Sequence, residues 1–288
     1  MGNTSMLASS TWSPAKQASA IELNARASAD FDAKVQESTE LLQVALQSHG
    51  AGCITQASSL GAEDMVVSHL INTLQLDIGI FVLETGALHA ETLALLDQLK
   101  ADSRAPVSVY HPVQESVLQF VAREGNEAMY KSIELRKACC GVRKMEPLGR
   151  MLAGRTAWVT GLRREQSNAR GEVPFVEPET RADGSRREKL NPLADWSWAD
   201  VWTYVQRHQV PYNPLHDQFM PSIGCAPCTR AIAVGEDFRS GRWWWEQDGA
   251  KECGLHVKAD DEADDSQAAG EVSMLPPAGA VSPIGGRP

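Results

Sequence analysis

The chain has 288 residues, of which 43% are hydrophobic, and its formal net charge at pH 7 is -10. This length can bury one large core or two moderate ones, so we expect a globular protein. No apolar run approaches the roughly 20 residues that cross a bilayer, and an acidic chain lacks a broad cationic surface for nucleic-acid phosphates. We therefore expect a cytoplasmic protein that binds neither membrane nor nucleic acid.

Short apolar runs and helical patterns alternate through most of the chain. Apolar residues at helical spacing predict a first helix from Phe31 that stops at Gly50. Further along, we expect strands at 53–57, 78–83, 107–110 and 157–160, and helices at 63–74 and 89–101. This alternation is typical of an α/β fold with a mostly parallel sheet and helices on both faces, in which ligands bind beyond the carboxyl ends of the strands.

Composition divides the chain into four parts. Residues 1–28 are rich in Ser and Ala without a clear period, which predicts a flexible segment. We place the α/β domain at 29–240 and a mobile segment at 241–256. Residues 257–288 are acidic and rich in Pro and Gly, and we expect them to be disordered.

The first predicted strand leads into SSLGAED, residues 58–64, at the start of a helix. A turn of small residues lets backbone N–H groups and the helix N-terminus face an anion, and serine hydroxyls add donors. We therefore expect a phosphate or sulfate here, although an ordinary capped helix start is the alternative. The candidate substrate-binding residues of this segment are Ser58, Ser59, Gly61, Glu63 and Asp64.

The second strand ends in LETG, residues 83–86. Neighbouring parallel strands end at the same edge of a sheet, so Thr85 and Gly86 are expected at the rim of the same pocket. The alternative is an ordinary strand-to-helix turn in which Gly86 supplies backbone freedom.

Four of the six cysteines fall into two pairs, Cys139 and Cys140 in KACCGVRK and Cys225 and Cys228 in GCAPC. Four thiolates are the ligand set of a tetrahedral zinc ion or an iron–sulfur cluster. Adjacent side chains on a helix point about 100° apart, which suits the separate corners of a cubane better than one ion. We favour a [4Fe–4S] cluster; buried unliganded cysteines or a redox dithiol are the alternative.

The two other cysteines differ in their surroundings. Cys53 lies in a predicted buried strand and is expected in the core. Cys253 lies in KECGLH, beside cationic residues and close to the end of the predicted ordered region. Positive charge favours the thiolate, and a mobile segment can carry it from a substrate to a second protein. Cys253 is therefore the candidate nucleophile, against the alternative of an exposed thiol without function.

Arginines flank the predicted pocket loops of an otherwise acidic chain. Guanidinium groups match the oxygens of phosphate and sulfate, so we expect anion binding in preference to an ordinary solvated face. The candidates lie in GLRREQSNAR and FRSGRWWW and are Arg163, Arg164, Arg170, Arg239 and Arg242.

The chain resembles the assimilatory adenylyl-sulfate (APS) reductases of bacteria and plastids, members of the phosphoadenylyl-sulfate (PAPS) reductase family. The resemblance covers about residues 50–256 and rests on SSLGAED, LETG, KACCGVRK, TGLRREQS, GCAPC, GRWWWE and ECGLH, in this order. It implies an adenine nucleotide α-hydrolase-like fold, related to the ATP pyrophosphatases (PP-loop) but with a modified phosphate loop.

The resemblance also implies an activity, the thioredoxin-dependent reduction of APS to sulfite and AMP in sulfate assimilation toward cysteine biosynthesis. The matching thiolate would attack the sulfate sulfur, expel AMP and become an S-sulfocysteine, from which thioredoxin or a similar dithiol protein would release sulfite. Cations would stabilise the sulfate oxygens, and a [4Fe–4S] cluster would tune the electrostatics without carrying the electrons. The catalytic set is then Cys253, Lys144, Arg239, Arg242 and His256. A homo-oligomer is left open.

The chain departs from the family at Glu84, where Asp is common, and at Ala87, where Arg is frequent. We expect these two differences to affect nucleotide binding at the pocket rim.

Three alternatives remain open. A PAPS reductase would lack the four cluster cysteines. An ATP-dependent tRNA-thiolation enzyme would want a fuller Gly-Gly turn and a basic RNA-binding surface. A non-catalytic zinc module would leave Cys253 and the arginines without a role.

Overall fold

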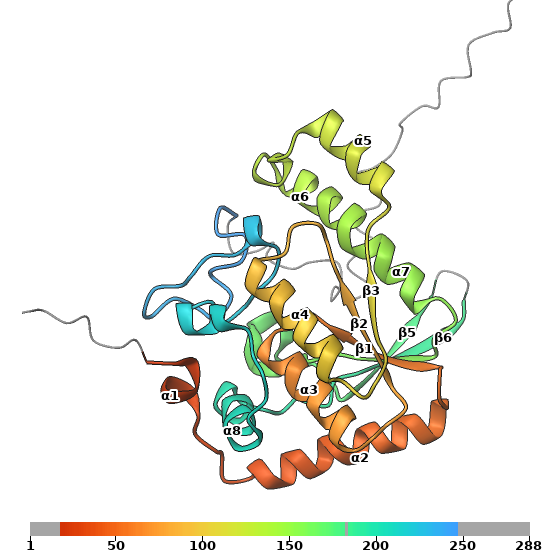
Figure 1. Ribbon diagram of the computed structural model, residues 1–288, viewed down its shortest axis with the longest axis vertical. Coiled ribbons are helices and arrows are strands. Elements are labelled where there is room, and N and C mark those ends of the chain that lie inside the picture. The colour runs from red at the N-terminus through yellow and green to blue at the C-terminus, as the bar shows by residue number, and fades with distance from the viewer. Residues whose placement is uncertain (1–17, 182–183, 247–288) are drawn as a thin grey trace, which may run out of the picture.

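The computed structural model describes residues 18–181 and 184–246. The predicted nucleophile Cys253, His256 and the predicted acidic tail lie outside these residues. In the described part, the structure is built around a six-stranded sheet in the order β3-β2-β1-β4-β6-β5 (Figure 1). The strands are β1 (Ile54–Ser58), β2 (Gly79–Leu83), β3 (Val107–Tyr110), β4 (Ala157–Val159), β5 (Val176–Thr180) and β6 (Arg186–Leu190).

Strand pairing confirms the predicted, mostly parallel sheet. β1 pairs in parallel with β2 and β4, β2 with β3, and β4 with β6. Only the hairpin of β5 and β6, which the sequence analysis did not predict, is antiparallel among the described strands. The four predicted strands match β1 to β4 to within one residue at each end.

The described part of the chain forms eight α-helices, and none of them is long and apolar enough to cross a membrane. They are α1 (Ala20–Asn24), α2 (Phe31–His49), α3 (Ala62–Thr73), α4 (Ala90–Asp102), α5 (Gln114–Glu124), α6 (Ile133–Cys140), α7 (Glu146–Leu152) and α8 (Trp198–His208). The first predicted helix matches α2, which stops at Gly50 with a φ of 82°. The helices predicted at 63–74 and 89–101 match α3 and α4.

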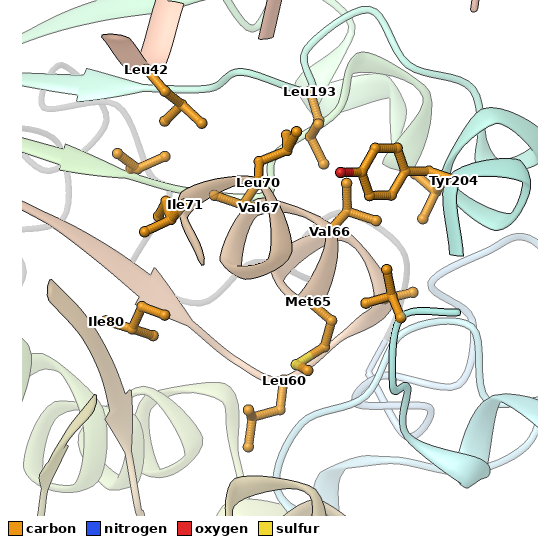
Figure 2. Close-up of a cluster of buried hydrophobic side chains, with 14 of the residues drawn as sticks. Leu42, Leu60, Met65, Val66, Val67, Leu70, Ile71, Ile80, Leu193 and Tyr204 are labelled. Carbon is orange, nitrogen blue, oxygen red and sulfur yellow. The ribbon is translucent and has the colours of Figure 1, made fainter. Parts of the chain in front are cut away.

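Alternation along the strands gives the sheet two apolar faces. In β2, Ile80 and Val82 belong to the larger hydrophobic cluster, which also contains residues of α2, α3, α4 and α8. Figure 2 shows part of this cluster, with side chains of α3 packed between the sheet and Tyr204 of α8. Phe81 points to the opposite face and packs with Trp158 and side chains of α7. Helices therefore cover both faces, as the sequence predicts.

The structure differs from the predicted flexible start for residues 18–28. Ser19 and Glu22 form a capping box at the start of α1. The Ala20 N–H donates to Asp217 Oδ1 at 2.7 Å, and the Ser28 N–H donates to Asp200 Oδ1 at 2.8 Å. A capping box provides hydrogen-bond acceptors for two backbone N–H groups at the start of a helix. The two long-range hydrogen bonds attach this segment to residues far along the chain, which no local sequence pattern reveals.

The topology positions the site. Strand order reverses between β1 and β4, because β2 and β3 lie on one side of β1 and β6 and β5 on the other side of β4. Loops that leave parallel strands at such a switch point diverge and open a crevice beyond the carboxyl ends of the strands.

Candidate active site

A cavity of about 190 Å³ lies at this switch point, beyond the carboxyl ends of β1, β2 and β4. It brings together the SSLGAED turn, the LETG segment and cations from three parts of the chain. The predicted residues that line it are Ser58, Ser59, Gly61, Glu63, Asp64, Thr85, Lys144, Arg170, Arg239 and Arg242.

The turn after β1 is shaped by its own backbone. Leu60 has a φ of 63°, in the left-handed region, and its side chain is fully buried in the larger core cluster. Such a conformation costs of the order of 1–3 kcal/mol for a residue other than glycine and persists where the surroundings impose it. Burial of Leu60 supplies that constraint, and the turn directs the start of α3 toward the cavity. The leucine was not among the predicted site residues.

Asp64 ties this turn to the loop after β4. Its Oδ2 accepts hydrogen bonds from the N–H and the hydroxyl of Ser59, both at 2.6 Å, and its Oδ1 accepts from the Gly161 N–H at 3.0 Å. A Cβ on Gly161 would lie 2.5 Å from Asp64 Oδ1, so this close approach requires glycine. Burial raises the pKa of Asp64 to about 6, against the opposing effect of its hydrogen bonds to Ser59. Asp64 therefore fixes the shape of the cavity wall that the turn after β1 and the loop after β4 form.

Glu63 is held by a buried arginine. Its Oε1 accepts hydrogen bonds from Arg163 Nε at 3.1 Å, Arg163 Nη2 at 3.0 Å and Gln166 Nε2 at 2.9 Å. Arg163 is completely buried, and its Nη1 also lies 2.8 Å from Glu165 Oε2. Two carboxylates thus compensate its charge in the interior, where an unpaired charge would be costly. Arg163, which was predicted to bind the substrate, does not line the cavity; it lies behind the cavity wall and holds Glu63.

Two more predicted residues do not line the cavity. Arg164 forms an ion pair with Asp195, and its Nε donates to the Val173 carbonyl at 2.8 Å. Gly86 has a φ of 70°, and its N–H donates to Glu84 Oε1 at 2.7 Å. The glycine therefore serves the turn, which was the alternative interpretation.

The two departures from the family also lie away from the cavity lining. The Glu84 carboxylate accepts from its own turn and lies 3.2 Å from His111 Nδ1. Ala87 lines a different cavity, described below, and its carbonyl accepts from the Ala226 N–H at 2.7 Å. The expectation that both residues form the nucleotide rim therefore does not match their positions.

An apolar wall completes the cavity and was missed by the sequence analysis. It includes Phe81, Leu148 and Trp158. Ala57 is in register with Phe81 and Thr55 with Trp158, so small side chains on β1 leave room between the two aromatic rings. Period-two alternation puts these residues on one face, but it does not say which face borders an opening.

The four paired cysteines converge around a second cavity, of about 230 Å³. All four are buried, although the pairs come from α6 and from a distant loop. The second cavity shares a wall with the first, because three residues line both: Lys144, Arg242 and Trp243.

Polar groups are directed at these sulfur atoms. Thr85 Oγ1 lies 3.2 Å from Cys225 Sγ. Burial raises the pKa of Cys228 to about 12, whereas Lys144 and Thr85 outweigh burial at Cys225 and lower the pKa of its thiol. The Trp243 indole N–H is buried at the same cavity and has no acceptor within the described residues.

The backbone widens directly after the first cysteine pair. Gly141–Met145 form a π-helix between α6 and α7. Such bulges are frequent at functional sites because the extra residue redirects neighbouring side chains. Here Arg143 Nη1 donates to the Thr85 carbonyl at 2.7 Å, and Lys144 lies between the two cavities. The sequence analysis gave no signal of this change in helix type.

Arg242 is held by the loop that carries the second cysteine pair. Its Nε donates to the Cys228 carbonyl and its Nη1 to the Ile223 carbonyl, both at 3.3 Å. A Cβ on Gly224 would lie 2.2 Å from Arg242 Nη2, so the guanidinium packs directly against this glycine.

Comparison with known proteins agrees with this arrangement. The phosphoadenosine phosphosulfate reductase domain matches residues 53–231. The chain belongs to this family. It is 54% identical over 203 residues to adenosine 5′-phosphosulfate reductase of Allochromatium vinosum, which covers 70% of this chain and 78% of that protein. The protein of the same name from Burkholderia cepacia is 54% identical over 201 residues, covering 70% and 79%.

Solved structures confirm the predicted fold class. Phosphoadenylyl-sulfate reductase from Candida auris has a TM-score of 0.56 at 23% identity, covering 73% of this chain and 100% of that chain. FMN adenylyltransferase from Candida glabrata has a TM-score of 0.52 at 11% identity, covering 87% and 88%. At these identities the likeness concerns the fold alone.

Proposed function

We propose that this protein is an oxidoreductase that reduces adenosine 5′-phosphosulfate (APS) to sulfite and AMP in sulfate assimilation. One observation carries the proposal: a cavity at the switch point that is lined by cationic side chains shares Lys144, Arg242 and Trp243 with a cavity lined by four cysteines. The family's domain description names the 3′-phosphorylated nucleotide, whereas the relatives at 54% identity are named for APS. The higher similarity favours APS.

The cavity offers a complementary surface to each part of this substrate. The turn after β1 and the N-terminus of α3 suit the phosphate, because backbone N–H groups and the helix dipole favour an anion. Between Phe81, Leu148 and Trp158 the wall is apolar and suits a planar base. Arg239, Arg242 and Lys144 then bind the sulfate oxygens.

The chemical step uses Cys253. Its thiolate attacks the sulfur of the sulfate group, a sulfur–sulfur bond forms, and the bond between sulfur and the bridging oxygen breaks. AMP leaves with the electron pair, and cations offset the charge that develops on the oxygens. A thiolate of thioredoxin or a similar dithiol protein then attacks Cys253 Sγ and expels sulfite. The second thiol of that protein resolves the mixed disulfide, so the reductant ends as a disulfide and Cys253 as a thiol.

The four cysteines of the second cavity fit a [4Fe–4S] cluster. All four cysteines line one cavity of about 230 Å³, more space than a lone metal ion fills. Thr85 Oγ1 lies 3.2 Å from Cys225 Sγ, and the buried Trp243 indole N–H at the same cavity has no acceptor among the described residues. Among the described residues, no group of three or more His, Cys, Asp or Glu lies in a position to hold a metal ion, so the proposal rests on the shared cavity and its donors. When bound, the cluster supplies a fixed charge distribution beside the sulfate site. Cys139, Cys140, Cys225 and Cys228 would hold it.

A mass measurement tests the proposal. The anaerobically purified protein is incubated without any thiol, with APS and separately with PAPS, and intact and peptide masses are recorded. We expect a sulfonate adduct on Cys253 from APS alone, and none in Cys253→Ser. Cys53→Ser, which changes a cysteine outside both cavities, should still form the adduct. An adduct from PAPS alone would identify PAPS, and not APS, as the substrate. If the protein binds the nucleotides but forms no adduct with either, the reductase function is rejected.

A further inference from the structure

A buried ion pair fixes the last described residue of the chain. Glu246 Oε1 accepts from Arg136 Nε at 2.9 Å, and Glu246 Oε2 accepts from Arg136 Nη2 at 2.9 Å. The side chains of Arg136 and Glu246 are 1% and 3% exposed. A bidentate arginine–carboxylate pair restricts both orientation and distance. Position 246 is therefore held on α6.

The same helix carries the first cysteine pair. Arg136 lies one helical turn before Cys139 and Cys140, and it also lines the cysteine cavity. The ion pair thus attaches the chain at Glu246 to the element that forms one wall of the shared site.

Trp243 turns the chain toward this anchor in a strained conformation. Its φ is 43°, in the left-handed region that a bulky aromatic residue rarely adopts. The ring is 1% exposed, and the Arg136 and Arg242 guanidinium carbons lie 4.6 and 4.7 Å from its centroid. The Glu246 N–H donates to the Trp243 carbonyl at 2.9 Å. Contacts on both sides of the turn therefore impose the strain.

We propose that the Arg136–Glu246 pair is a positioning device that sets where the segment carrying the nucleophile begins. This inference rests on the proposed function of Cys253. The cysteine follows Glu246 by seven residues, so it can lie no more than roughly 25 Å from the anchored position. Neither Arg136 nor Glu246 lines the substrate cavity, so they are positioning residues for Cys253.

A fixed starting point raises the effective concentration of a tethered group near its target. Loss of the anchor should therefore slow the attack of Cys253 on the sulfate. It should leave the binding of APS nearly unchanged, because neither Arg136 nor Glu246 lines the substrate cavity. This separation distinguishes a positioning role from a general structural one.

The test uses Glu246→Gln, which keeps the size of the side chain but removes its charge. Three quantities are measured in the full-length protein: visible absorbance of the cluster, the Kd for APS, and the single-turnover rate of the sulfonate adduct on Cys253. We expect cluster content and Kd within twofold of the wild type and an adduct rate at least tenfold lower. Glu246→Asp, which keeps the charge but shortens the reach, should recover part of that rate.

Glu236→Gln is the matched control, because Glu236 forms a more exposed ion pair with Arg230 in the same loop region. Its adduct rate should equal that of the wild type. An unchanged rate in Glu246→Gln would overturn the inference. Loss of cluster, APS binding and rate together in both Glu246 variants would also overturn it, because the pair would then serve folding alone. Absence of the adduct in the wild type would instead reject the proposed function.

Discussion

Thr85 Oγ1 lies 3.2 Å from Cys225 Sγ, so a hydroxyl at the carboxyl end of β2 contacts a cysteine 140 positions later in the chain. Thr85 also lines the cavity at the switch point, and its carbonyl accepts a hydrogen bond from Arg143. One residue of LETG therefore touches both halves of the site.

Thr85→Val should weaken the proposed cluster site. Valine matches threonine in shape but lacks the hydroxyl, and a hydrogen bond to a charged group contributes about 1.5–3 kcal/mol. We expect iron to be lost to a chelator about tenfold faster than in the wild type, measured by the decay of visible absorbance under anaerobic conditions. Thr85→Ser retains the hydroxyl and should behave like the wild type. Equal loss rates in the valine variant and the wild type would contradict a role for this hydrogen bond.

APS binding should weaken as the pH falls through about 6. Burial raises the pKa of Asp64 to about 6, so its carboxyl becomes protonated below that pH and can no longer accept at both oxygens from Ser59 and Gly161. At pH 5 about one tenth remains ionised, which predicts an affinity about tenfold lower than at pH 7.5. Equilibrium binding between pH 5 and 7.5 measures this effect.

Asp64→Asn should bind APS weakly at pH 7.5 and should lack this pH dependence. Asp77→Asn, at an exposed position, is the control and should follow the wild-type curve. If the affinity of Asp64→Asn for APS still falls about tenfold between pH 7.5 and pH 5, the pH dependence arises from another group.

Gly224→Ala should strongly lower activity without unfolding the protein. The added methyl would lie 2.2 Å from Arg242 Nη2, so the guanidinium must leave the wall shared by both cavities. We expect kcat/KM for APS to fall at least 100-fold, with far-UV circular dichroism unchanged, since loss of one preorganised donor costs about 10² to 10³ in rate. Gly149→Ala, in α7 where a Cβ meets nothing within 4 Å, should keep full activity. Wild-type kcat/KM in Gly224→Ala would show that Arg242 can relocate without consequence.

Asp200 should make the fold sensitive to acid. Burial would raise its pKa, but hydrogen bonds from the N–H groups of Ser28 and Ser197 and from Lys34 outweigh it and lower the pKa from 3.8 to about 2. The stabilisation is thus fully present above pH 3.8 and is lost as the pH falls through 2. The shift corresponds to about 2 kcal/mol.

Chemical denaturation at pH 6 and at pH 2.5 measures this contribution. The free energy of unfolding of the wild type should fall between these pH values by more than that of Asp200→Asn. The difference between the two falls should approach 2 kcal/mol. Identical falls would mean that Asp200 does not couple folding to protons.

Local patterns carried much of the prediction. The pattern of apolar residues predicted the positions of β1 to β4, α2, α3 and α4, because the hydrophobic periods of strands and helices can be recognised within short stretches of sequence. Motif spacing located the SSLGAED turn and both cysteine pairs, and the tertiary structure places them at two adjoining cavities. The hairpin of β5 and β6 was missed because four of the five residues of β6 are charged and β5 alternates only between exposed and half-buried positions.

Side-chain roles within those motifs required the tertiary structure. Arg163 and Arg170 share one segment, yet Arg163 is buried against Glu63 while Arg170 lines the cavity. The sequence shows that both are cations near a strand end, but it does not show which one meets a carboxylate from a distant helix.

The sequence by itself therefore determined the α/β class, the positions of the main elements and the residue types gathered at the site. Only the tertiary structure decided that Lys144, Arg242 and Trp243 separate two cavities, and that Glu246 is anchored on α6 by Arg136. The physical reason is that periodicity and turn chemistry act between neighbours along the chain. Burial and ion pairing act between residues that only the packed sheet and helices bring into contact.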